Sequence, residues 1–354
     1  MRSHDLEGVT LALVSKGKGI LAADETVPTL TKRFDTLGIA STEESRRVYR
    51  ELLFAPDIAE FISGVIMHEE TLHQRSSGGT PFPEFLAIRG ILPGIKVDRG
   101  TKPLAGSPNE FVTEGLDGLR DRLSEYRAMG ARFAKWRAVI HASDTLPSPA
   151  CVSANGSALA RYAALCQEQG LVPIVEPEVL MDGTHTIERC EEVTGVVLHA
   201  VFHALFQQGV ALEEMLLKPN MVIAGKKCTR QASVDEVATA TLRCLRRHVP
   251  AAVPGIVFLS GGQTATLATA HLNSINRQVG PKPWRITFSY GRALQDPALV
   301  AWAGRDDNLK VAAHALHRRA SFNSAACVGK YTDEMESASG GTNDPPHRSG
   351  WSDD

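Results

Sequence analysis

The sequence predicts an α/β protein with the closed (β/α)8 (TIM) barrel fold, and three observations lead to this prediction. Eight short apolar runs have strand character, and amphipathic or alanine-rich stretches with helical spacing clearly separate seven of them. Repeated strand–helix units favour a parallel sheet, and eight of them suggest closure into a barrel. The length of 354 residues exceeds that of most single domains but is ordinary for such a barrel.

The apolar runs have the length and composition of buried strands. Pro219 ends the ladder pairing of the sixth run, because proline has no backbone N–H. The predicted strands are Gly19–Asp24, Ile62–Met67, Gly94–Asp98, Arg132–Arg137, Val172–Glu178, Met215–Asn220, Gly255–Ser260 and Arg285–Tyr290.

Helical spacing occurs between most of these runs. A start signal at Ser41 and Thr42, followed by two glutamates, opens the helix predicted over Thr42–Phe54. The other predicted helices are Gly115–Ala128, Ala154–Gln169, Ile187–Gln207, Val234–Val249 and Gln263–Asn276. An open doubly wound sheet is the alternative fold. It more often has a glycine-rich turn after its first strand, where this chain has Ala22-Ala23-Asp24-Glu25.

Composition and charge narrow the class of protein. A hydrophobic fraction of 43% and a charged fraction of 22% are ordinary for a globular protein, and a net charge of -2 favours neither nucleic acid nor an anionic membrane as partner. No apolar stretch approaches the ~20 residues of a membrane helix, and the segment Met1–Asp5 lacks the apolar core of a signal peptide. We therefore expect a cytoplasmic protein.

Cysteine and histidine spacing supports no metal site, and since no nucleotide fingerprint is present either, we expect no cofactor. The six cysteines contain no Cys-x-x-Cys pair, which disfavours a disulfide framework and a zinc knuckle. His68 and His73 are too far apart for a short ligand pair on one helix face. His199 and His203 have i, i+4 spacing without a carboxylate between them, so we interpret them as helix surface or satisfied core.

Two regions differ in composition. Residues 1–331 carry the strand–helix pattern and form one predicted domain. Residues 332–354 are rich in Gly, Ser, Asp, Glu and Pro and nearly free of apolar side chains, apart from Met335 and Trp351. We expect this tail to be mobile.

Polar or ionisable residues stand at the end of nearly every predicted strand. The carboxyl ends of barrel strands converge on the face where active sites of this fold lie. Any one such residue could be a solvated strand end, but seven agreeing ends predict a site. These residues are Asp24, Lys96, Lys135, Glu176 with Glu178, Lys218, Ser260, and Ser289 through Arg292.

Lys218 lies in the most apolar of these runs and is the candidate nucleophile. A desolvated lysine suits Schiff-base chemistry with a carbonyl, whereas the alternative is a lysine that reaches solvent at a strand end. Burial and neighbouring lysines lower an amine pKa, and Lys135 is the candidate charged neighbour. Lys96 is expected to be held by an acid.

Glu176 and Glu178 are candidates for acid/base work. They are two residues apart in Val175-Glu176-Pro177-Glu178 and so point to the same side of an extended strand. Paired carboxylates raise the pKa of one member, which suits proton transfer near neutral pH. A solvated Glu-Pro-Glu turn is the alternative.

Two anion sites are predicted where Ser-Gly-Gly (260–262) and Ser-Tyr-Gly-Arg (289–292) precede helices, because exposed amides and a helix N-terminus attract phosphate. A second cluster, Thr26, Thr29, Lys32 and Arg33, could hold a second phosphate at the far end of a bisphosphate sugar. The candidate substrate- and phosphate-binding residues are Thr26, Thr29, Arg33, Lys96, Arg137, Ser260, Gly261, Gly262, Ser289, Gly291 and Arg292.

From about Gly17 to Tyr331 the chain resembles the class I fructose-bisphosphate aldolases. The segments that carry the resemblance are 17–25, 94–100, 133–137, 175–178, 217–221, 258–263 and 288–294. The resemblance implies a (β/α)8 barrel, usually a homotetramer, that reversibly cleaves fructose 1,6-bisphosphate without metal. The products would be dihydroxyacetone phosphate and glyceraldehyde 3-phosphate.

The resemblance also implies roles for single residues. Lys218 resembles the Schiff-base lysine and Glu176 the acid/base of the carbinolamine, while Asp24 resembles the acceptor of the C4 hydroxyl proton. Lys135 resembles the polarising neighbour of Asp24. Ser260, Gly261, Gly262 and Arg292 would bind the ketone-side phosphate, and Arg33 and Lys96 would contact substrate at or near the other phosphate.

The chain departs from the family pattern at two places. Thr26-Val27-Pro28-Thr29 replaces a loop with serine and glycine, and Pro28 stiffens it. Animal members end in a tyrosine that assists proton exchange on the enamine, whereas the last tyrosine here is Tyr331. Another group or water would then supply that proton. The alternatives are a Schiff-base enzyme for another sugar phosphate and a barrel that serves mainly as a binding scaffold.

Overall fold

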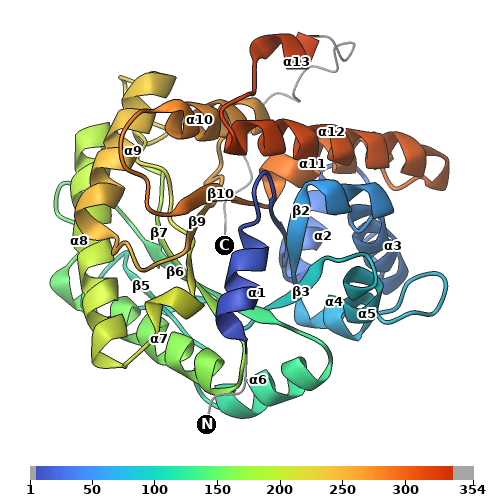
Figure 1. Cartoon of the computed structure of the whole chain (residues 1–354), viewed down its shortest axis with the longest axis horizontal. Coiled ribbons are helices and arrows are strands. Elements are labelled where there is room, and N and C mark those ends of the chain that lie inside the picture. Colours follow the sequence, from blue (N-terminus) through green and yellow to red (C-terminus); the bar gives the residue numbers. More distant parts are fainter. Residues whose placement is uncertain (1–4, 338–354) are drawn as a thin grey trace.

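The computed structural model describes residues 5–337 as a closed barrel of parallel strands surrounded by helices (Figure 1). The strand order is β1-β10-β9-β8-β7-β6-β3-β2, so each barrel strand lies beside the barrel strand that follows it along the chain, and the last lies beside the first. The strands are β1 (Gly19–Ala23), β2 (Ile62–Met67), β3 (Leu92–Lys96), β6 (Phe133–Ile140), β7 (Val172–Val179), β8 (Leu216–Leu217), β9 (Gly255–Phe258) and β10 (Arg285–Tyr290). The predicted (β/α)8 fold is confirmed, and the open sheet is excluded.

All eight predicted runs form barrel strands, and β2 and β10 have the predicted bounds. The strand β8 is shorter than predicted, because Pro219 has no N–H to pair. The chain nevertheless stays in register beyond it: the Lys218 amide donates to Val175 O at 2.8 Å, and Pro219 O accepts from the Leu259 amide at 3.2 Å. Lys218 therefore continues the barrel wall.

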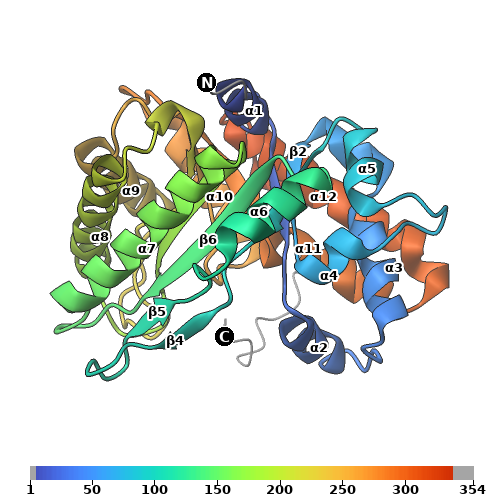
Figure 2. The ribbon, with the colours of Figure 1, turned by 90° about the horizontal axis from the view of Figure 1, so that it is seen from below.

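The outer layer consists of helices that follow the strands (Figure 2). The helix α8 (Ile187–Gln207) has the predicted bounds, and the other predicted helices differ at their ends. The remaining helices are α2 (Val27–Asp35), α3 (Glu43–Leu53), α4 (Glu69–His73), α5 (Phe82–Ala87), α6 (Leu119–Ala128), α7 (Pro149–Glu168), α9 (Val234–His248), α10 (Ala265–Arg277), α11 (Arg292–Trp302) and α12 (Leu309–Cys327), with short 3-10 turns η1 (Pro56–Glu60), η2 (Leu212–Glu214) and η3 (Asp306–Asn308).

The helix α1 (Leu6–Leu13) closes the amino-terminal end of the barrel. Asp5 caps it by accepting a hydrogen bond from the Gly8 amide at 2.8 Å. Its apolar side chains form one buried cluster with the barrel interior, whose members include Ile20, Ala22, Ile66, Phe133, Val172, Ile174, Leu216 and Val257. Because this end is filled, the barrel is open to a ligand only at the carboxyl ends of its strands.

Six helices were not predicted, namely α1, α2, α4, α5, α11 and α12, and two further features were not expected. A hairpin of β4 (Thr101–Pro103) and β5 (Phe111–Thr113) follows β3 outside the barrel. The helix α13 (Asp333–Ser337) lies within the segment predicted to be mobile, and Glu336 accepts hydrogen bonds there from Arg319 and from the Tyr331 hydroxyl. The rest of the segment predicted to be mobile, residues 338–354, lies outside the described part. Within 5–337, no helix is long and apolar enough to span a membrane.

Candidate active site

A row of polar side chains lies one layer above the apolar barrel interior, and strand alternation explains it. Side chains two apart on a strand share a face. Four strand residues pack inside the barrel: Ala22, Phe133, Ile174 and Leu216. The residue two positions after each of them therefore also faces the barrel axis. These residues are Asp24, Lys135, Glu176 and Lys218. Four of the five residues predicted to be catalytic thus lie in, or directly after, four different strands and meet at one end of the barrel.

The four side chains form a continuous chain of ion pairs. The Lys218 Nζ lies 3.1 Å from Glu176 Oε1, and the Lys135 Nζ lies 3.2 Å from Glu176 Oε2. The Lys135 Nζ is also 2.7 Å from Asp24 Oδ2. Lys218 is not a lysine that reaches solvent, because its side chain is only 5% exposed and Glu176 holds it inside.

The charges in this chain keep Asp24 and Lys135 ionised. Burial alone would raise the pKa of Asp24, but Lys135, Lys218 and Lys96 outweigh it and hold that pKa well below its usual range. Burial would lower the pKa of Lys135, yet Asp24, Glu176 and Asp98 raise it above its usual range. Lys135 is therefore a cation held among carboxylates.

Lys96 lies beside Lys135 in the strand register and is held by an acid, as expected. Its Nζ is 2.6 Å from Asp98 Oδ1 and also donates to Asp98 O. Asp98 in addition accepts hydrogen bonds from the Gly100 and Arg137 amides. Asp98 thus holds both the Lys96 side chain and the segment of the chain that follows β3.

Glu178 is paired with an arginine of the neighbouring strand. Its Oε2 accepts a hydrogen bond from Arg137 Nε at 2.5 Å. Arg137 therefore compensates this carboxylate, and the acid/base role of Glu178 beside Glu176 stays a prediction. Glu178 holds the Arg137 guanidinium, whose side chain is still 23% exposed at the barrel mouth.

The two predicted anion sites follow β9 and β10. Gly261 and Gly262 have φ of 50° and 69°, a left-handed backbone that favours glycine, and α10 begins shortly after them. Gly291 directly precedes α11, whose first residue is Arg292. Ser289 is buried beside Ile20, and no hydrogen-bond partner of its Oγ is found within residues 5–337. Backbone amides and these side chains could hold an oxyanion here.

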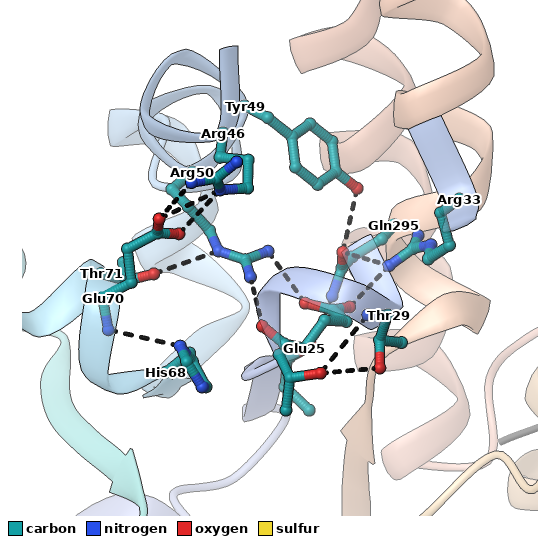
Figure 3. Close-up of polar contacts among 12 residues, drawn as sticks. Glu25, Thr29, Arg33, Arg46, Tyr49, Arg50, His68, Glu70, Thr71 and Gln295 are labelled. Carbon is teal, nitrogen blue, oxygen red and sulfur yellow. Dashed lines mark hydrogen bonds and ion pairs between the residues drawn. The ribbon is translucent and has the colours of Figure 1, made fainter. Parts of the chain in front are cut away.

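The second cluster has a structural role that the sequence did not reveal (Figure 3). Arg33 is buried and pairs with Glu25 at 2.6 Å and with Asp296 at 2.8 Å, and it also donates to Gln295. Two carboxylates thus compensate this guanidinium, and the predicted substrate contact of Arg33 stays a prediction. The Thr26 and Thr29 hydroxyls lie 2.9 Å apart and bond each other at the start of α2. Pro28 fits this first turn, where no N–H is needed.

Comparisons with known proteins agree with this geometry. A family model described as "Glycolytic: Fructose-bisphosphate aldolase class-I" matches residues 5–344. The chain belongs to the class I fructose-bisphosphate aldolase family. It is similar to a "Probable fructose-bisphosphate aldolase class 1" of Xanthomonas axonopodis pv. citri, with 54% identity over 94% of this chain and 99% of the relative. It is also similar to "Fructose-bisphosphate aldolase B" of Gallus gallus, with 51% identity over 92% of this chain and 90% of the relative.

A solved aldolase has the same fold. The structure of fructose-bisphosphate aldolase from Plasmodium falciparum, in complex with TRAP and a small-molecule inhibitor, superposes with a TM-score of 0.91. It is 49% identical in sequence, and the match covers 92% of this chain and 95% of the solved one. Within residues 5–337 of this aldolase, no group of three or more His, Cys, Asp or Glu side chains could hold a metal ion.

Two residues near the site were not predicted to belong to it. Lys226 lies over the glycine turn, because a Cβ placed on Gly262 would be 2.7 Å from its Nζ. It also lies 3.4 Å from Asp182 Oδ1. His68 follows β2 as the N-cap of α4. Alternation from Ile66 could have predicted the direction of His68, but nothing in the sequence indicates that Lys226 folds back onto this turn.

Proposed function

We propose that this aldolase reversibly cleaves fructose 1,6-bisphosphate into dihydroxyacetone phosphate and glyceraldehyde 3-phosphate through a Schiff base on Lys218. The observation that carries the proposal is the chain of ion pairs from Lys218 through Glu176 and Lys135 to Asp24. It joins an amine for the carbonyl, an acid/base for its protons and a carboxylate for the hydroxyl in one buried row. The names of the relatives support the same substrate.

Lys218 is the proposed nucleophile. Its neutral amine adds to the C2 carbonyl, and the resulting carbinolamine loses water to give an iminium ion. The Glu176 carboxyl lies 3.1 Å from Nζ, within reach of both the amine proton and the departing hydroxyl. Glu176 accepts the proton that leaves the amine and returns a proton to the hydroxyl that leaves as water.

Asp24 is the proposed base for bond cleavage. It takes the proton from the C4 hydroxyl, the C3–C4 bond breaks, and the electron pair of that bond passes into the iminium to form an enamine. Glyceraldehyde 3-phosphate leaves as the aldehyde, and the enamine is then protonated at C3 and hydrolysed to dihydroxyacetone phosphate. The depressed pKa of Asp24 keeps it ionised. The Lys135 ammonium, 2.7 Å from Asp24 Oδ2, stabilises negative charge that develops on the C4 oxygen.

The phosphates define the two ends of the proposed substrate. Ser260, Gly261, Gly262 and Arg292, with Ser289 and Gly291, are proposed to bind the ketone-side phosphate. Lys96, Arg137 and the Thr26 and Thr29 hydroxyls are proposed to bind at or near the other end. Two anion sites favour a bisphosphate over a monophosphate, and the complete acid/base set favours an enzyme over a binding scaffold.

The assembly and location remain part of the proposal. A homotetramer is supported by exposed apolar side chains on α8, where Val196 is 53% and Phe206 is 82% exposed. A cytoplasmic location is supported by six cysteines that are all unpaired. Light scattering on the eluted protein would measure the assembly.

One trapping experiment tests the mechanism. The protein is incubated with dihydroxyacetone phosphate and reduced with borohydride, and the modified lysine is mapped by mass spectrometry. We expect one label at Lys218 that is lost in Lys218→Ala, and cleavage activity that survives excess chelator. The absence of label under all conditions would contradict the Schiff base. Labelling without cleavage of fructose 1,6-bisphosphate would favour another sugar phosphate.

A further inference from the structure

His68 occupies the same row as the ion-paired residues, although neither the ion pairs nor the phosphate sites use it. Ala23 is paired with Met67, and Met67 with Ile95, in the barrel register. One residue further along each strand, Asp24, His68 and Lys96 therefore lie side by side. The backbone of His68 is still extended, with φ of −85° and ψ of 159°, so its side chain continues the alternation from Ile66 and faces the barrel axis.

The ring of His68 is fixed on one side. Its Nδ1 accepts a hydrogen bond from the Glu70 amide at 3.3 Å, and the Glu70 carboxylate is bound by Arg46 through both Nε and Nη2 (Figure 3). Since an amide can only donate, Nδ1 carries no proton and the neutral ring has its proton on Nε2. No hydrogen bond of Nε2 is found within residues 5–337. This atom is nevertheless accessible to solvent, because it is not among the buried polar atoms that lack a partner.

The surroundings of His68 favour this neutral form. Burial lowers its pKa, and the Arg50 and Lys96 cations on neighbouring elements act in the same direction, while Asp24 and Glu70 oppose them. A neutral imidazole with a free Nε2–H between a carboxylate and an ammonium is suited to an uncharged polar group. It is less suited to a phosphate, which an imidazolium would bind more strongly.

We infer that His68 binds a hydroxyl group on the aldehyde half of the sugar phosphate through its Nε2–H and so determines specificity for a polyol substrate. This inference rests on the proposed function and adds a substrate-binding residue to it. The position beside Asp24, the proposed base for the C4 hydroxyl, places Nε2 on the aldehyde side of the bond that breaks. The ketone half, bound by Lys218 and the glycine turn, would not contact His68.

Three variants separate the two nitrogens of the ring. His68→Gln keeps a donor near the position of Nε2, His68→Asn keeps an acceptor near the position of Nδ1, and His68→Phe keeps the ring without either nitrogen. If the hydroxyl contact matters, His68→Phe and His68→Asn should lose about tenfold in kcat/KM, as expected for one hydrogen bond to an uncharged group, and His68→Gln should lose less. If His68 only caps α4, His68→Asn should be the least affected.

The readouts are cleavage of fructose 1,6-bisphosphate, cleavage of fructose 1-phosphate, and exchange of the C3 proton of dihydroxyacetone phosphate with deuterated solvent. We expect the loss in His68→Phe to be equal for both sugars and absent from the exchange reaction, which needs only the ketone half. Loss with the bisphosphate alone would assign His68 to the phosphate and overturn the inference. Equal loss in the exchange reaction, or no loss in any variant, would also overturn it.

The parent enzyme separates this inference from the proposed function. If the unsubstituted protein cleaves neither sugar, the proposed function fails, and the inference fails with it. If the unsubstituted protein cleaves them and His68→Phe does so equally well, the inference alone fails. Thermal unfolding of each variant shows whether a loss of activity reflects the site or the fold.

Discussion

The Nζ of Lys218 and the Oε1 of Glu176 lie 3.1 Å apart, and both side chains are at least 95% buried. Their strands are adjacent, since Leu217 is paired with Val175 and the next residues continue the register. Removal of an ammonium or carboxylate from water costs several kcal/mol per ion, and only close pairing offsets this cost. The Glu176 carboxylate pairs with two ammonium groups, so the acid/base is also the group that keeps both lysines inside the barrel.

Glu176→Gln should slow turnover by about 10²- to 10⁴-fold, which is the usual contribution of a positioned acid/base. The amide keeps the shape of the side chain but cannot exchange a proton with the carbinolamine. Rapid-quench kinetics with borohydride should show slower labelling of Lys218, and the labelled site should stay the same. Unchanged labelling kinetics would contradict the proposed role. Glu214→Gln, at a glutamate in η2 outside the row, is the matched control.

Asp24→Asn should make the free energy of unfolding less dependent on pH at the acid end. The folded pKa of Asp24 lies below its ordinary value of 3.8, so the unfolded chain binds more protons as pH falls. The stability that Asp24 contributes is therefore fully present above about pH 5 and is lost as pH falls toward the folded pKa. At neutral pH we expect a loss of about 2–3 kcal/mol, less than for a wholly unpaired charge, because Lys135 keeps Glu176 as partner.

Urea unfolding of the parent and Asp24→Asn proteins between pH 3 and 8, about the range that spans the ordinary carboxyl pKa, measures this difference. The gap in the free energy of unfolding should be constant at the upper end and narrow below about pH 4. A gap that widens as pH falls would contradict the depressed pKa.

Lys226→Met should weaken binding of the ketone-side phosphate. The Lys226 Nζ lies over the Gly262 turn but is paired only loosely with Asp182 and is partly exposed, so its contribution to binding is about 1 kcal/mol. We expect KM for fructose 1,6-bisphosphate to rise about fivefold with little change in kcat, and the effect to shrink at high salt. Steady-state kinetics with Lys227→Met, at the adjacent exposed lysine, is the control. Equal effects in the two variants would contradict a specific contact.

Deletion of residues 338–354 should leave cleavage within about twofold of the parent, because this segment contains no tyrosine to exchange the enamine proton. We expect truncation to affect turnover less here than in relatives that end in tyrosine. Truncation after Thr332 tests another feature, since it also removes Glu336 from the buried Arg319 and should lower the melting temperature. Collapse of cleavage in the shorter deletion, with an unchanged melting temperature, would show that the tail takes part in turnover.

Much of the barrel was predictable because its signals are local. Each strand is a continuous apolar run with a polar residue at its end, and the alternation of side chains along a strand places Asp24, Lys135, Glu176 and Lys218 on the interior face. The parallel order of such strands brings their carboxyl ends together. The residues of the candidate site could therefore be named from the sequence.

Partners of charged side chains were not predictable, because they come from distant parts of the chain. Arg33 has the residue type of a phosphate ligand, but Asp296 reaches it from α11 and compensates its charge, and Gln295 of the same helix accepts a hydrogen bond from it. Glu178 has the spacing of a second acid/base, but its carboxylate forms an ion pair with Arg137 on the neighbouring strand. The direction in which each pKa moves depends on such contacts across strands. The sequence by itself determined which groups reach the barrel mouth, and the tertiary structure alone decided which of them compensate one another, because charge interactions depend on distance in space and on burial.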